Sequence, residues 1–105
     1  MAESQLLCRF SDLIEAQPQQ FDVAGTPIVV VRIGEQVYAL EDRCSHEDFP
    51  LSDGLVEVDE CQIECSRHGA MFSLETGAAF SLPAIKSVAT IGVRVIDGHV
   101  EVTLP

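Results

Sequence analysis

Apolar and polar residues alternate in short runs along most of the chain, and Gly, Pro and Asp separate the runs. This pattern predicts short β-strands joined by tight turns. The expected strands are Leu6–Phe10, Phe21–Val23, Ile28–Ile33, Val37–Leu40, Leu55–Val58, Cys61–Cys65, Met71–Leu74, Val93–Ile96 and His99–Leu104. Asp59-Glu60 and Asp97-Gly98 are the expected turns of two hairpins, and Ser11–Gln20 is an expected connection with one helical turn. The chain is therefore predicted to be all-β and to form one domain over residues 1–105.

Two segments interrupt the strand pattern. Glu41–Gly54 is polar, contains Pro50 and lacks strand periodicity, and Ser66–Ala70 is a short polar loop. The hairpin predicted between them would bring both segments to the same end of the domain. We expect the chemistry of the protein to lie in these two loops.

Each loop contains one cysteine and one histidine at close spacing. Cys44 and His46 lie in the first loop, Cys65 and His68 lie in the second, and eighteen residues separate His46 from Cys65. One thiolate and one imidazole from each loop make a four-ligand metal site. Two Cys and two His also suit a structural zinc ion, although nothing near His68 reads as the helix or knuckle such sites use.

The spacing Cys-x-His, a gap in the high teens and Cys-x-x-His resembles the signature of the Rieske [2Fe–2S] family. The resemblance covers most of the chain and extends to the paired opening strands, the segments after each loop and a proline loop, at Phe21–Leu40, Leu51–Gly54, Phe72–Gly77 and Leu82–Ala84. It implies a Rieske fold, with antiparallel sheets and a small cluster-binding subdomain over about residues 41–84. It also implies one [2Fe–2S] cluster. Cys44 and Cys65 would bind the inner iron, and His46 and His68 the outer iron.

Three further residues with reactive side chains are interpreted as structural. Cys8 lies in an apolar strand, and Cys61 shares a predicted strand face with Cys65, so both are expected to pack as small apolar residues. His99 follows a hairpin turn and is expected to be exposed. Family members of high potential link their two loops by a disulfide, but the corresponding positions here, at or beside Phe49 and at Arg67, hold no cysteine.

The net charge of the chain limits the classes of molecule that it can bind. The sequence has 17 acidic and 6 basic residues, a formal charge of −11. Such a surface repels nucleic acid and anionic lipid and favours a protein partner with a basic docking face. No apolar run approaches the roughly 20 residues of a membrane helix, and the first residues do not resemble an export signal. A cytoplasmic monomer is the expected form.

The resemblance implies a soluble one-electron carrier rather than an enzyme. Its partners would be a flavoprotein NAD(P)H-dependent ferredoxin reductase and a terminal non-haem iron oxygenase of an aromatic-ring-hydroxylating dioxygenase system. The chain is not expected to be the oxygenase, because a mononuclear iron site needs two more histidines and a carboxylate, and only His99 remains. The alternatives are a Rieske subunit of another redox or iron–sulfur assembly system and a zinc-stapled interaction module.

Two features predict a cluster potential at the low end of the Rieske range. High-potential members carry Ser and Tyr hydroxyls where this chain has Ala70 and Phe72. Nine acidic residues lie between Glu41 and Glu64, against one arginine, and they disfavour adding an electron. The docking face is expected at the cluster tip, with apolar residues Phe49, Pro50, Leu51 and Pro83 surrounded by acidic residues Glu47, Asp48 and Asp53.

Overall fold

The computed structural model describes residues 4–43, 50–65, 69–79 and 87–103. Within these ranges it has strands β1 (Ser4–Arg9), β2 (Gln19–Val23), β3 (Thr26–Ile33), β4 (Gln36–Glu41), β5 (Leu55–Glu57), β6 (Gln62–Glu64), β7 (Met71–Ser73), β8 (Thr90–Ile96) and β9 (His99–Thr103). Two single-turn 3-10 helices accompany them, η1 (Phe10–Asp12) and η2 (Leu51–Asp53). The prediction of an all-β chain is confirmed. Among the described residues, no helix has the length and apolarity to cross a membrane.

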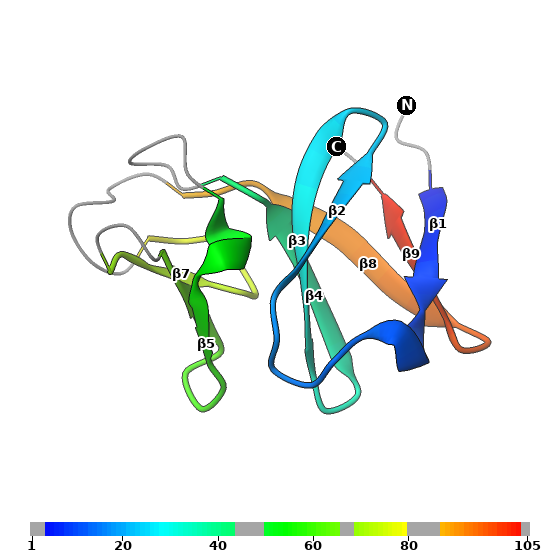
Figure 1. Ribbon diagram of the computed structural model, residues 1–105, viewed down its shortest axis with the longest axis horizontal. Coiled ribbons are helices and arrows are strands. Elements are labelled where there is room, and N and C mark those ends of the chain that lie inside the picture. Colours follow the sequence, from blue (N-terminus) through cyan, green and yellow to red (C-terminus); the bar gives the residue numbers. More distant parts are fainter. Residues whose placement is uncertain (1–3, 44–49, 66–68, 80–86, 104–105) are drawn as a thin grey trace.

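The strands form two antiparallel sheets that lie side by side (Figure 1). The larger sheet has the order β1-β9-β8-β4-β3-β2, and the smaller one has the order β5-β6-β7. The small sheet is built from the chain between β4 and β8, so it is an insertion into the larger sheet. This arrangement places the described ends of both predicted loops beside the small sheet.

Strand β3 explains how the two sheets are joined. Its apolar run Ile28–Val31 is fully buried, and successive side chains of a strand point to opposite faces. Ile28 and Val30 enter an inner cluster that the larger sheet encloses: Leu13, Val23, Ile28, Val30, Ala39, Ile91, Val100 and Val102. Val29 and Val31 enter a shared cluster between the sheets: Val29, Val31, Leu40, Leu51, Ile63, Cys65, Ala70, Phe72, Leu74 and Val88. One strand thus serves both hydrophobic cores.

Most of the predicted strand boundaries shift by one to three residues, and the largest shift is the start of β8. Phe10 begins η1 instead of ending β1, and β8 begins at Thr90 because Thr90 and Ile91 pair with β4. Cys61 does not open a strand. It has a φ of 53°, in the left-handed region that breaks strand geometry, and β6 begins at the next residue.

Candidate metal centre

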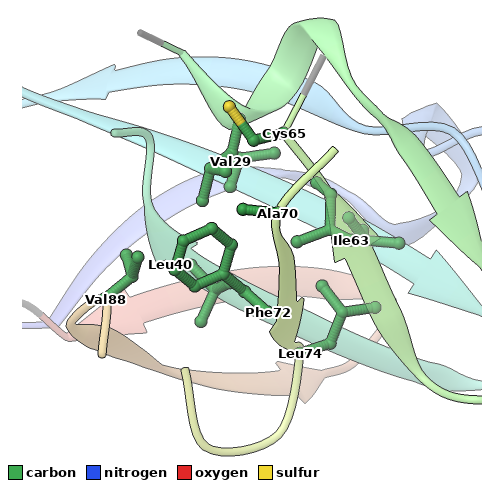
Figure 2. Close-up of a cluster of buried hydrophobic side chains, with 10 residues drawn as sticks. Val29, Leu40, Ile63, Cys65, Ala70, Phe72, Leu74 and Val88 are labelled. Carbon is green, nitrogen blue, oxygen red and sulfur yellow. The ribbon is translucent and has the colours of Figure 1, made fainter. Parts of the chain in front are cut away.

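The structure describes only one of the four predicted ligands, Cys65. Cys44, His46 and His68 lie outside the described residues. Cys65 directly follows β6, is 1% exposed and belongs to the shared cluster. Figure 2 shows it at one end of that cluster, with its sulfur pointing away from Phe72 and Leu74.

The backbone around Cys65 forms the closed end of the β6–β7 hairpin. The Cys65 N–H donates to the Ala70 carbonyl at 2.7 Å, and the Gly69 N–H donates to the Cys65 carbonyl at 2.9 Å. Gly69 has a φ of 74°, a conformation that favours glycine. These bonds hold together the two residues that flank positions 66–68. Cys65 therefore has a fixed backbone and a buried thiol.

The ends of the first loop are joined by a buried carboxylate. Asp42 is 4% exposed, and its Oδ1 accepts a hydrogen bond from the Ser52 N–H at 2.7 Å. Its Oδ2 accepts from the Ser52 hydroxyl at 2.7 Å and from Gln20 Nε2 at 2.5 Å. Asp42 is not expected to have a special role from the sequence, where it counts only among the acidic residues near the loops. Its position between an apolar strand and Cys44 is the one sequence signal that sets it apart.

The segment that contains the predicted proline loop also begins and ends beside the small sheet. Leu82–Ala84 lies outside the described residues, but Ala79 bridges to Phe72 of β7. On the other side, the Val88 N–H donates to the Gly77 carbonyl at 2.8 Å. Leu51, Cys65, Ala70 and Val88 all belong to the shared cluster. The residues flanking the three segments therefore meet in one hydrophobic core.

The structure corrects one expected docking residue. The sequence predicts Leu51 on the docking face, but its side chain is fully buried because η2 turns it into the shared cluster. Pro50 is half-buried, and Asp53 is exposed. The other expected residues of this face, Glu47, Asp48, Phe49 and Pro83, lie outside the described residues.

Both remaining cysteines pack as predicted. Cys8 lies against the inner cluster, and burial raises the pKa of its thiol. Cys61 lies against the shared cluster, where burial raises its pKa and a hydrogen bond with the Tyr38 side chain opposes that shift. His99 is exposed, as expected, with Nδ1 at 3.1 Å from the Asp97 carbonyl oxygen.

The two positions that lack hydroxyl groups are buried close to Cys65. Ala70 is the hairpin partner of Cys65, and both Ala70 and Phe72 have no exposed surface. Figure 2 shows the Ala70 methyl between Cys65 and the Phe72 ring. Apolar side chains therefore lie beside the one predicted ligand that the structure describes.

Comparison with known proteins agrees with this fold. The family model of the Rieske [2Fe–2S] domain matches residues 3–92. The chain is 36% identical over 98 residues to the 3-phenylpropionate/cinnamic acid dioxygenase ferredoxin subunit of Escherichia coli (strain K12), covering 93% of this chain and 91% of that protein. The structure of the ferredoxin of carbazole 1,9a-dioxygenase from Nocardioides aromaticivorans IC177 superimposes with a TM-score of 0.92 and 32% identity, over 94% of this chain and 95% of that one. A chain in a complex of reduced oxygenase and oxidized ferredoxin in carbazole 1,9a-dioxygenase gives a TM-score of 0.86 and 34% identity, over 94% and 91%.

The chain therefore belongs to the Rieske [2Fe–2S] family. Within it, the chain is a ferredoxin of the dioxygenase type, an electron carrier rather than a catalyst, and its cofactor is one [2Fe–2S] cluster. The environment of Cys65 fits that cofactor. A thiolate ligand to an iron–sulfur cluster needs a fixed backbone and protection from water, and Cys65 has both.

Proposed function

We propose that this protein carries single electrons from an NAD(P)H-dependent flavoprotein reductase to a terminal non-haem iron oxygenase, as a cytoplasmic monomer. The observation that carries the proposal is the near-full-length similarity to ferredoxins of dioxygenases. A similar chain occurs in a complex of oxygenase with ferredoxin, which supports a direct encounter with the oxygenase. The aromatic substrate stays open, because the carrier does not bind it and its relatives serve different dioxygenases.

The proposed ligands are Cys44 and Cys65 for the inner iron and His46 and His68 for the outer iron, within a single domain over residues 1–105. Two features of the described residues support this set. Gly69, which follows His68 in the sequence, donates its N–H to the Cys65 carbonyl, so the two described ends of the second loop are held together. Cys44 and His46 lie between Asp42 and Ser52, whose side chains are bonded together. The proposed cluster-binding part covers about residues 41–84.

When bound, a cluster with mixed Cys and His ligands takes up and releases one electron, at a potential between about −150 and +300 mV. The residues of this chain determine where in that range it titrates. The shared cluster excludes water from Cys65, and Ala70 and Phe72 offer it no hydroxyl donors. The charge of −11 adds to the cost of an extra negative charge. We therefore place the potential at the low end of the range.

The proposed docking face is the tip of the domain around the two loops. Asp53 lies exposed at the edge of this face, and Glu47 and Asp48 belong to the loop beside it. These carboxylates would attract a basic surface on the reductase or the oxygenase and speed encounter. A carrier must leave one partner to reach the next, so the complexes are expected to be weak and short-lived.

Electron delivery to an oxygenase tests the proposal. The holoprotein is reduced anaerobically and mixed with the oxidized oxygenase component of the 3-phenylpropionate/cinnamic acid dioxygenase, while EPR follows both proteins. We expect one electron per ferredoxin to appear on the oxygenase. The matched control is Cys8→Ser, which changes a thiol in the larger sheet and should transfer normally. A reduced holoprotein that gives no electron to this or any other dioxygenase would contradict the proposal.

A further inference from the structure

We propose that Asp42 is a positioning residue for the cluster, because its carboxylate clasps the two ends of the first loop and fixes the segment that carries Cys44 and His46. The proposal rests on the ligand set given under the proposed function. Asp42 lies two residues before Cys44, and Ser52 lies six residues after His46. Their side chains therefore bracket both of the ligands proposed for this loop.

The clasp is formed by three hydrogen bonds to one carboxylate. Ser52 donates twice, from its backbone N–H to Oδ1 and from its hydroxyl to Oδ2, both at 2.7 Å. Gln20 Nε2 donates to Oδ2 from strand β2. Two bonds to the same residue fix both the distance and the orientation of Ser52 relative to Asp42.

The clasp is also tied to the rigid part of the molecule. The Asp42 backbone N–H donates to the Pro27 carbonyl of β3 at 3.0 Å. On the opposite side of the loop, Ser52 belongs to η2, whose neighbouring residue Leu51 is buried in the shared cluster. Asp42 thus connects the loop ends to β2 and β3 of the larger sheet, and η2 connects them to the core beneath Cys65.

Burying a carboxylate is unfavourable unless hydrogen bonds replace its hydration. Burial of Leu51 already attaches the end of the first loop to the core. The Asp42–Ser52 hydrogen bonds attach the same end a second time, so we infer that the buried carboxylate has a role beyond stability. Fixing both ends of a loop reduces the conformations that its ligands can adopt, and an ordered ligand set holds a metal centre more tightly. Retention of the cluster is the property that this second anchor would serve.

The chemistry of the three donors also predicts which substitutions matter. Alanine removes all three acceptor contacts. Asparagine keeps one carbonyl oxygen for the Ser52 N–H, and its amide can donate to the Ser52 hydroxyl or to a reoriented Gln20 side chain. Asp42→Asn should therefore retain part of the clasp. Asp22 provides a matched control, since it is an exposed aspartate with one hydrogen bond, from the Gly25 N–H at 3.0 Å in the β2–β3 turn.

The experiment measures how fast the purified holoproteins lose iron to an excess of a ferrous chelator, well below their unfolding temperatures, together with the EPR g-values of the reduced cluster. We expect Asp42→Ala to release iron at least about tenfold faster than the wild type, a change of about 1.4 kcal/mol. Its g-values should shift, because loosely held ligands change the geometry at the iron. Asp42→Asn should lie between the two, and Asp22→Ala should match the wild type.

A second comparison separates positioning from general destabilisation. Ser52→Ala should speed iron release in the wild-type background and add nothing in the Asp42→Ala background, because its hydroxyl then has no partner. If Asp42→Ala does not fold, Asp42→Asn and Ser52→Ala carry the test. Release at the wild-type rate with unchanged g-values would overturn the proposal. The oxygenase takes no part in this assay, so failed electron transfer to it would leave the result standing.

Discussion

Gly54 lies against the backbone carbonyl of Glu64, so closely that a Cβ on Gly54 would overlap the carbonyl oxygen. Gly54 ends the turn after η2, and Glu64 is the last residue of β6, directly before Cys65. The exit of the first loop therefore packs onto the strand that leads into the second. The contact couples the backbones of the two proposed ligand loops.

This contact predicts that Gly54→Ala displaces one loop relative to the other. Because the overlapped atom belongs to the backbone of a strand, a small side-chain adjustment cannot relieve it. We expect a lower thermal midpoint and faster loss of the visible absorbance of the cluster on heating. Gly92→Ala is the control, since its Cβ would meet nothing nearer than 3.6 Å. Equal behaviour of the two variants would contradict the coupling.

The ligand set predicts two iron and two sulfide per chain, with an axial EPR signal after reduction by dithionite. Replacing His46 or His68 by Ala should abolish the cluster, because an iron that has lost a ligand is open to water and hydrolysis. Cys8→Ser should keep it, since Cys8 packs against the inner cluster. Metal analysis and EPR of each variant provide the measurement. One zinc per chain without sulfide would instead support the zinc-stapled module.

The buried positions beside Cys65 predict how the potential can be raised. A hydroxyl donor to a cluster sulfur stabilises the reduced, more negative state by roughly 1 kcal/mol. Ala70→Ser and Phe72→Tyr should therefore each raise the midpoint potential by tens of millivolts, as measured by redox titration. Leu74→Met, which changes a buried side chain of the same cluster without adding a hydroxyl, is the control. A double variant that titrates at the wild-type potential would exclude the missing-donor explanation.

Charge steering predicts a salt-dependent rate of reduction by the reductase. The rate should fall steeply as ionic strength rises toward physiological values, where the screening length is about 8 Å. Reversing Glu47 and Asp48 to Lys should slow the reaction and leave the potential nearly unchanged. Reversing Asp59 and Glu60, exposed in the β5–β6 turn, changes the net charge equally and should slow it much less. If both double variants react alike, the docking face lies elsewhere.

Leu51 and Leu55 form a matched pair for testing the shared cluster. Leu51 is fully buried, whereas Leu55 is 68% exposed. Leu51→Ala should leave a cavity that costs about 2–5 kcal/mol and lowers the thermal midpoint by about 10 °C or more. Leu55→Ala should lower it by less than about 4 °C. Circular dichroism on heating measures both, and similar midpoints would show that Leu51 is a surface contact after all.

The sequence determined most of the strands and the family. Alternation with a period of two is a local property, so β2, β3, β4 and β9 could be located from their own residues. The run Ile28–Val31 has strand length in the sequence, and the structure divides its buried side chains between the two clusters. The spacing of Cys44, His46, Cys65 and His68 identified the family, because few other chemistries use that order of residues.

Only the tertiary structure decided which residues beside the loops point inward. In the sequence, Asp42 resembles an ordinary surface acid. In the structure it is buried and accepts hydrogen bonds from Gln20 and Ser52, which are 22 and 10 residues away. Leu51 resembles an exposed loop residue in the sequence, but η2 turns its side chain into the shared cluster, which also contains Cys65 and Val29. Cys61 is not in its predicted strand. It ends a turn that its N–H closes by donating to the Val58 carbonyl, and its backbone there is left-handed. The burial of Asp42 and Leu51 depends on residues that are distant in sequence, and a local pattern of apolar and polar residues cannot predict such contacts.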